Sequence, residues 1–404
     1  MASLLKQDKR RIVLLLGALS AVGPFSIDMY LPGFQDIARD LQTDIAHVGQ
    51  TLTSYFIGIS IGQLIYGPII DRYGRKVPLQ IGLVIYTVSS LLCIMAPNID
   101  ALIGLRGLLA LGGCAGMVAS RAIVRDLFPV TETAKIFSQL MLVMGAAPII
   151  APTIGGWMVS LWGWKSIFLF MGSFSSIMLL AVARLLPESH QPDKSVDLRP
   201  ARVVGDYLNV LKNPLFLTFA LASGCASACL FSYISGSPVF FMEISGFSNT
   251  QYGWIFGLNA LGYIGGSQLN SLMLKRFDGY KIISVAVIAL VIFAVLLLIG
   301  TLFNVLPTPV AIGIIFLYLL SLGFISPNTA AISLQPFTRS AGSASAMLGF
   351  IQMLMGALAS GIVSYLTNSS AIPMALLMTV GSASCAVLII GYTVKRKKRT
   401  LVSV

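Results

Sequence analysis

The sequence predicts an all-α integral membrane protein with twelve transmembrane helices. Of its 404 residues, 56% are hydrophobic and only 10% are charged, whereas a soluble domain usually carries about 25% charged residues. The basic residues also form clusters that precede the first apolar segment and then recur after every second one. Clusters that alternate in this way are typical of a chain that crosses a membrane repeatedly.

Twelve apolar segments are long enough to cross the hydrocarbon core, which takes about 20 residues of helix. Pro and Gly interrupt many of them, and transmembrane helices tolerate this. The basic run MASLLKQDKRR precedes a segment that has no signal-type cleavage site, so we expect a first transmembrane helix rather than a signal peptide. The segments are 12–34, 47–69, 77–96, 100–122, 135–160, 164–186, 214–241, 250–272, 280–303, 307–333, 340–366 and 370–393.

Almost all Lys and Arg residues lie on one side of this predicted bundle. The loops of the other side hold only Arg39 and Lys165. By the positive-inside rule, both termini are expected to be cytoplasmic. The formal net charge of +12 therefore sets topology and allows contact with membrane lipid, and it does not indicate a nucleic-acid groove.

The longest polar loop divides the chain into two six-helix halves. It contains Pro187, Pro192 and Pro200 together with charges of both signs. We expect an N-terminal bundle at 1–186, a cytoplasmic linker loop at 187–213, and a C-terminal bundle with a basic tail at 214–404. Two six-helix halves around a site at the bilayer midplane are the plan of a rocker-type secondary transporter.

Several other classes of function lack the residues that they need. All five cysteines lie in apolar segments, where we expect small packing residues and neither a metal site nor a disulfide. The segments contain no nucleophile–His–acid set, and the chain has no nucleotide-binding sequence. We therefore expect neither an enzyme with catalytic residues nor a self-contained ATP-driven pump, and no cofactor other than protons as the coupling ion. The chain is expected to act as a monomer.

The stretch GPIIDRYGRKVPL, residues 67–79, stands between the second and third segments. Gly67 would let two helices approach closely, and Gly74 permits a tight turn. Asp71 at a helix end can face the positive N-terminus of another helix. A plain topology anchor would explain the positive charges but not these positions. The basic residues of the stretch, which can pair with acids and phospholipid headgroups, are Arg72, Arg75 and Lys76.

This stretch resembles the signature of the major facilitator superfamily, G-x-x-x-D-R-x-G-R-K. The resemblance implies the twelve-helix major facilitator fold and a cytoplasmic latch that forms in one state and breaks in the other. In the family, the partner of the aspartate is span 11, which here starts near Ser340. The pair Arg125 and Asp126, after the fourth segment, could join this latch or could be a plain solvated charge pair.

Further stretches resemble Bcr/CflA-type multidrug exporters, the bicyclomycin-resistance branch of the drug:proton antiporters. They are SIDMYLP at 26–32, SRAIVRDLFP at 120–129 and APIIAPTIGGW at 147–157. The last looks like the antiporter motif of span 5, with Ala151 before the proline where the usual pattern has Gly. In span 4, the family pattern R-x-x-Q-G-x-G is matched at Arg106 and Gly112 but not at Leu109 or Ala110.

The predicted antiporter helix, in the fifth segment, combines prolines and glycines. Pro148 and Pro152 remove backbone donors and bend the helix, while Gly145, Gly155 and Gly156 leave a smooth surface for packing against the opposite half. Such a helix would suit a moving seal against proton leak. An ordinary kinked packing helix would carry the same residues.

Asp28 is the one acid well inside the predicted segments. At a rise of ~1.5 Å per residue, Asp28 lies about 25 Å from the inner surface and Arg106 about 9 Å from the outer one, so their depths are compatible. Burial disfavours the charged carboxylate and a nearby arginine favours it, so the group could take up and release a proton. A permanent Asp28–Arg106 bridge, or substrate contact without titration, are the alternatives.

The resemblance implies a proton-coupled multidrug efflux transporter that exports small amphipathic compounds across the bacterial inner membrane by alternating access. The alternative is a proton-coupled transporter of a specific metabolite, such as a nucleoside, in the same fold. Exporters of varied drugs favour large apolar and aromatic cavities, although aromatic residues on a span can also pack or face lipid. The candidates for the substrate cavity are Tyr30, Tyr55, Phe231, Tyr233, Asn259 and Gln352.

Overall fold

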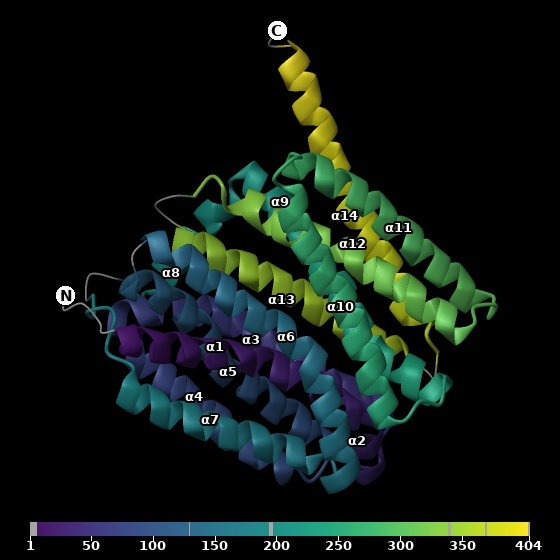
Figure 1. The fold of residues 1–404 in the computed structure, drawn as a ribbon, viewed down its shortest axis with the longest axis horizontal. Helices are drawn as coiled ribbons and strands as arrows, with labels where there is room; N and C mark the ends of the chain where they lie inside the picture. Colours follow the sequence, from purple (N-terminus) through teal and green to yellow (C-terminus); the bar gives the residue numbers. More distant parts are fainter. Residues whose placement is uncertain (1–5, 129, 194–196, 338–340, 368–369, 403–404) are drawn as a thin grey trace.

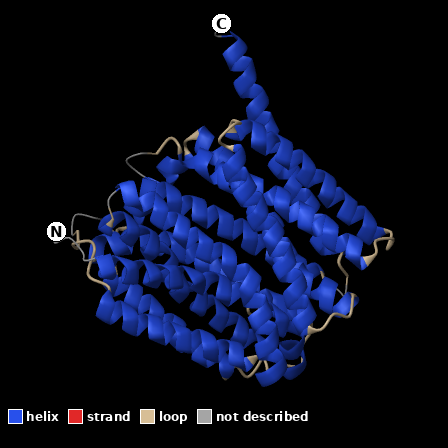
Figure 2. Cartoon of the chain, viewed as in Figure 1, coloured by secondary structure: helices blue, strands red, loops and turns tan. Residues whose placement is uncertain are grey.

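The computed structural model describes residues 6–402 except 129, 194–196, 338–340 and 368–369 (Figure 1). In this part of the chain all regular secondary structure is helical (Figure 2). The elements are α1 (Lys6–Asp28), the 3-10 helix η1 (Leu31–Gly33), α2 (Phe34–Asp40), α3 (Ile45–Tyr73), α4 (Lys76–Ile94), α5 (Ile99–Leu127), α6 (Val130–Trp162), α7 (Lys165–Leu185), α8 (Pro200–Leu211), α9 (Pro214–Pro238), the π-helix η2 (Val239–Ile244), α10 (Asn249–Met273), α11 (Gly279–Leu302), α12 (Thr308–Leu334), α13 (Ala341–Leu366) and α14 (Ile372–Val402).

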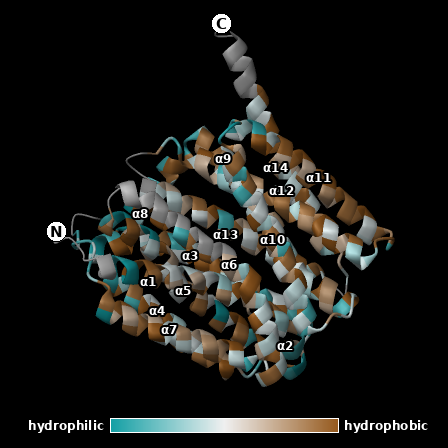
Figure 3. Ribbon diagram, viewed as in Figure 1, coloured by the Kyte–Doolittle hydropathy of each residue, from teal (hydrophilic) through white to brown (hydrophobic). Residues whose placement is uncertain are grey.

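Ten helices within the described residues are long and apolar enough to cross a membrane. Hydrophobic residues cover most of their length (Figure 3), and the predicted all-α membrane class is confirmed. Helices α6 and α10 are not among the ten. In α6 the apolar part that qualifies is the shorter Ala146–Trp162, and α10 carries amides such as Asn259 and Asn270. The count of twelve spans therefore stays a prediction.

The helices form two groups that meet along one boundary (Figure 1). In the first group α3 and α4 pack on α5, α4 also packs on α7, and α1 packs on α6. In the second group α9 and α11 pack on α14, while α12 packs on α10 and α11. Two pairs make the most extensive contacts across the boundary: α3 lies against α13, and α6 lies against α10.

The basic residues gather at one end of this bundle. Below, the end that carries residues 72–76, 121–128 and 273–281 is called the basic end, and the end that carries α2 and Lys165 is called the opposite end. Helix α14 continues as far as Val402, beyond the predicted end of its segment at 393, and projects from the bundle (Figure 1).

The linker is not a loop throughout, because it contains helix α8. Pro200 is the first residue of this helix, where the missing N–H of proline costs nothing. On one face Tyr207 and Val210 pack with residues of α9 and α13 into a small second core. The opposite face exposes Val204 and Leu208. The sequence prediction of a polar loop missed this helix because it is short and amphipathic.

Candidate functional site

Arg106 lies in the middle of α5 and is completely buried. Its guanidinium carbon is 4.4 Å from the ring centroid of Tyr30 and 4.6 Å from that of Tyr55. One terminal nitrogen, Nη2, donates to the carbonyl oxygen of Ser26 at 2.8 Å. The other two nitrogens, Nε and Nη1, find no hydrogen-bond partner in the described chain. Aromatic rings stabilise a buried cation, but unsatisfied donors cost free energy, so this group can still accept a partner.

Asp28 is the last residue of α1, at the point where the chain turns into η1. Its side chain is 5% exposed, and its carboxylate has neither a hydrogen bond nor an ion pair among the described residues. Arg106 bonds instead to Ser26 and stacks on tyrosines. A permanent Asp28–Arg106 bridge, one of the alternatives above, is therefore not formed in this structure.

The surroundings of Asp28 come from both halves of the chain. Its charge lies within electrostatic reach of the hydroxyl group of Tyr55 on α3. It also reaches the hydroxyl groups of Tyr233 on α9 and Tyr252 on α10. The depth of Asp28 along its helix could be predicted from the sequence. Which tyrosines face Asp28 depends on how each helix is rotated, so the sequence did not predict these three tyrosines as a group.

The six residues predicted to contact substrate pack against other side chains. Phe231 on α9 meets Phe56 on α3, with ring centroids 4.1 Å apart. The amide nitrogen of Asn259 donates to the Tyr233 hydroxyl at 3.0 Å. Gln352 donates to the hydroxyl of Ser223 at 2.7 Å.

In this arrangement none of the six lines the cavity at the basic end. Tyr30 and Tyr55 hold Arg106, and Phe231 and Tyr233 form part of the packed aromatic core. Their contact with substrate stays a prediction for a different arrangement of the helices.

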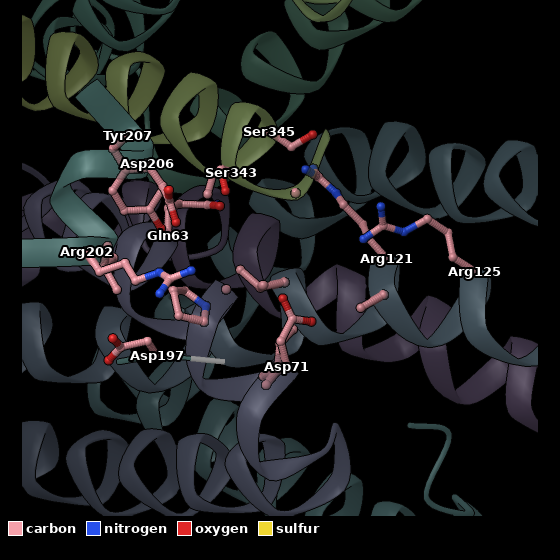
Figure 4. A pocket seen from close by; sticks show the side chains of 18 residues that line it. Gln63, Asp71, Arg121, Arg125, Asp197, Arg202, Asp206, Tyr207, Ser343 and Ser345 are labelled. Atoms are coloured by element: carbon pink, nitrogen blue, oxygen red, sulfur yellow. The ribbon is translucent and has the colours of Figure 1, made fainter. Parts of the chain in front are cut away.

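A cavity of about 420 Å³ lies at the basic end between α3, α5, α8 and α13 (Figure 4). Its lining combines polar and charged side chains with apolar ones such as Ile70, Val118 and Val203. The polar side chains labelled in Figure 4 are Gln63, Asp71, Arg121, Arg125, Asp197, Arg202, Asp206, Tyr207, Ser343 and Ser345.

Arg75 is the centre of the predicted latch motif. Its Nη1 pairs with Asp71, and its Nε donates to Asp126 Oδ2 at 2.8 Å. Burial alone would lower the pKa of the Arg75 guanidinium, but the bonds to Asp126 and Asp71 outweigh burial and raise it. The structure thus brings Asp126 together with Asp71, whereas Arg125 points into the cavity instead of joining this network (Figure 4).

Glu188 ties the start of the linker to the latch motif. Its carboxylate accepts the backbone N–H groups of Arg75 at 2.8 Å and Lys76 at 3.1 Å. Gly74 has φ +86°, a conformation that favours glycine, and a Cβ on it would also displace the Glu188 carboxylate, which would lie 2.8 Å away. Sequence reasoning missed Glu188 because a single acid after a span carries no signal of its long-range partner.

The remaining residues of the motif have varied surroundings. Lys76 Nζ donates to the carbonyl of Ala183 at 2.9 Å, and the Arg72 guanidinium lies 5.9 Å from the Tyr73 ring centroid. The expected close approach at Gly67 is wrong for this arrangement, because an added Cβ would meet only atoms at 4.0 Å. Gly67 lines the cavity, which leaves space beside it. The predicted start of span 11 at Ser340 lies outside the described residues.

At the opposite end α6 and α10 are in backbone contact. A Cβ on Gly156 would lie 2.8 Å from the Asn249 carbonyl oxygen, and one on Gly253 would lie 2.7 Å from that of Pro152. Asn249 Nδ2 also donates to Asp36 Oδ2 at 2.8 Å. Together these contacts join the two halves at the opposite end, and they are called the seal below.

The other predicted residues of the antiporter helix lie within α6. Pro148 and Pro152 are inside the helix, and Gly155 packs on the backbone of Met29, next to Asp28. Gly145 belongs to α6, but its surroundings are outside the described residues. All five cysteines are free and buried, and the described residues contain no group of three or more side chains that could hold a metal ion.

Known proteins resemble this chain over most of its length. The sequence profile of the Major Facilitator Superfamily matches residues 15–360. A protein of Bacillus subtilis named uncharacterized MFS-type transporter YdgK is 34% identical and covers 96% of this chain and 97% of its own. A bicyclomycin resistance protein homolog of Haemophilus influenzae is 30% identical, with 92% of each chain covered. Multidrug resistance protein D of Escherichia coli is 26% identical over 93% of this chain and 94% of its own. These relatives confirm the resemblance to the Bcr/CflA-type branch.

Solved structures share the fold. A D-xylose-proton symporter superposes with a TM-score of 0.74 at 14% identity, covering 93% of this chain and 97% of its own. A nucleoside transporter gives a TM-score of 0.72 at 15% identity, covering 95% and 99%. The family and these structures are membrane transporters rather than enzymes. The chain is therefore a membrane-integral protein that belongs to the Major Facilitator Superfamily.

Proposed function

We propose that this chain is a proton-coupled multidrug efflux transporter of the bacterial inner membrane. The names of the relatives, which include bicyclomycin and multidrug resistance proteins, support export of small amphipathic compounds. The clustering of basic residues at one end supports twelve spans with both termini in the cytoplasm, because positively charged loops stay on that side. The basic end is then the cytoplasmic end.

The observation that carries the proposal is the environment of Asp28. A carboxylate that is 5% exposed and has no hydrogen bond or ion pair among the described residues is costly when ionised. Protonation removes that cost, and so does the approach of a cationic or polar substrate. Proton and substrate therefore compete for Asp28, and this competition is the exchange step that an antiporter needs.

Arg106 contributes a fixed positive charge that is bonded to α1 at Ser26, two residues before Asp28. It is held by the Ser26 carbonyl and by the rings of Tyr30 and Tyr55, and two of its nitrogens are unsatisfied. When a helix shift brings the Asp28 carboxylate to these nitrogens, the ionised form is stabilised and the proton is released. When the two groups separate, the carboxylate regains a proton.

Alternating access requires the two ends of the bundle to open in turn. The seal at Gly156 and Gly253 closes the outer end in this arrangement, while the cavity lies at the cytoplasmic end. Opening the outer end requires α6 and α10 to separate. In that state Asp71 turns from Arg75 towards the N-terminus of α13, and the latch closes the cytoplasmic end.

The test compares wild type with Asp28→Asn in everted membrane vesicles of an efflux-deficient host. Addition of drug should release protons from acidified vesicles of wild type, and the variant should release none at any pH between 6 and 8 because an amide cannot titrate. The control is Asp44→Asn: Asp44 is an exposed helix N-cap, a position at which Asn serves equally well. Full proton release and full drug protection in Asp28→Asn would refute the proposal.

A drug-susceptibility panel with the same strains separates drug export from the alternative function, transport of a specific metabolite. A susceptibility panel that shows protection against several unrelated compounds supports multidrug export. Protection or uptake that is restricted to one metabolite class, with coupling still dependent on Asp28, would favour a specific metabolite transporter.

A further inference from the structure

Two arginines of α5 extend into the cavity at the basic end. Arg121 and Arg125 lie one helical turn apart, and both line the cavity (Figure 4). Neither forms a hydrogen bond or an ion pair with any residue in the described part of the chain. Like charges at this spacing repel each other. A negative group bound between the two guanidinium groups would remove this repulsion.

Arg202 of α8 enters the same cavity, and acidic side chains do not neutralise this set. Asp71 is paired with Arg75 and Asp197 lies 4.0 Å from Arg199, so both carboxylates already have an arginine partner. Asp206 is the remaining carboxylate of the lining. Three guanidinium groups therefore face one carboxylate that lacks an arginine partner.

The C-terminal half cannot supply the missing negative charge. Residues 214–404 contain only two acids, Glu243 and Asp278. Glu243 lies in η2, at the far end of the chain segment that begins with α9 at the basic end. Asp278 is the N-cap position of α11, and neither residue lines the cavity. In this arrangement the C-terminal half therefore offers the arginines no carboxylate among the residues that line the cavity.

The first turn of α13 faces the arginines across the cavity. Gly342 and Ser343 belong to this turn and line the cavity. Ser345, which follows in the same helix, also lines it (Figure 4). The N-terminus of a helix presents free backbone N–H groups and a partial positive charge. Guanidinium groups with backbone N–H donors form the standard surroundings of a phosphate group in proteins.

We propose that the cavity between α5, α8 and α13 binds a phosphate group, held by Arg121 and Arg125 on one side and by the first turn of α13 on the other. Because α5 and α13 belong to different halves, the bound phosphate connects them and favours the arrangement seen here. The phosphate comes from an anionic lipid headgroup or from a soluble phosphate. This site is separate from Asp28 and Arg106 and regulates the exchange without taking part in it.

The experiment measures the thermal unfolding midpoint of the full-length protein in nanodiscs. One arm uses phosphatidylcholine nanodiscs and adds inorganic phosphate, with sodium chloride at the same ionic strength as the reference. The other arm uses nanodiscs that contain phosphatidylglycerol and omits soluble phosphate. We expect a saturable rise of the midpoint in at least one arm. A rise only with phosphatidylglycerol identifies the lipid headgroup as the source, and a rise only with inorganic phosphate identifies the soluble ligand.

The double variant Arg121→Gln/Arg125→Gln should weaken the apparent affinity about tenfold or more, because charge-assisted hydrogen bonds are lost. Arg276→Gln, in the exposed loop before α11 and outside the lining, is the control and should respond like wild type. If the double variant does not unfold cooperatively, the single variant Arg125→Gln serves instead. No rise in either arm, or an equal rise in the variant and in wild type, overturns the proposal.

Discussion

Substituting Gly253 with Ala should weaken the seal at the opposite end. The added Cβ would lie 2.7 Å from the carbonyl oxygen of Pro152 and 3.2 Å from the Cα of Thr153. Both are backbone atoms of α6, so the clash can be relieved only if the two helices move apart. Overpacking of this kind costs about 1–3 kcal/mol. A cost of that size shifts the equilibrium away from the sealed arrangement by about 5- to 150-fold.

Disulfide cross-linking measures this shift. The hydroxyl oxygens of Ser160 and Thr250 are 3.5 Å apart across the seal, so Cys at these two positions should cross-link readily, while the native cysteines are buried. Gly253→Ala should slow the cross-linking. Gly265→Ala is the matched control, because it lies in the same helix and its Cβ would meet nothing within 4 Å. Equal rates in the two variants would refute the argument that α6 and α10 must separate.

Two further predictions concern polar groups with unusual surroundings. Arg106→Met should abolish proton-coupled transport but keep or raise the thermal unfolding midpoint, because a buried cation with two unsatisfied donors is replaced by an apolar side chain of similar length. A lower midpoint with transport retained would contradict this. Glu188→Ala should lower the free energy of unfolding by about 1–2 kcal/mol, because backbone N–H groups of Arg75, Lys76 and Ser189 lose their acceptor. Chemical unfolding measures this free energy, with Lys212→Ala as the control because Lys212 lies at the end of α8, away from the motif. Equal stability of the two variants would count against a stabilising role of Glu188.

Structural properties that depend on a single helix could be predicted from the sequence. The apolar segments located the ten helices that are long and apolar enough to cross a membrane. The spacing within residues 67–76 located the turn at Gly74, whose positive φ only glycine adopts easily. The rise per residue was enough to expect Asp28 and Arg106 at similar depths. These properties follow from local composition and helix geometry, so they do not require knowledge of the neighbours.

Properties that depend on the rotation and packing of several helices could not be predicted. Depth alone suggested a bridge between Asp28 and Arg106, but the arginine faces the rings of Tyr30 and Tyr55 and the Ser26 carbonyl instead. Glu188 and the latch motif are more than a hundred residues apart, and nothing in either stretch indicates the other. The proposed phosphate site is made by three helices. In the sequence its arginines were topology signals and, for Arg125, a candidate member of the latch, and nothing in the sequence indicated a shared cavity.

A single deep carboxylate limits how the membrane can drive transport. If Asp28 alone carries the proton, one cycle exchanges one proton for one substrate molecule. Exchange against a monovalent cation then moves no net charge, so only the pH gradient drives it, at about 1.4 kcal/mol per pH unit. Exchange against a neutral compound moves one positive charge inward and also gains about 2.3 kcal/mol per 100 mV of membrane potential. The same transporter would therefore concentrate neutral compounds against steeper gradients than cationic ones in an energised cell.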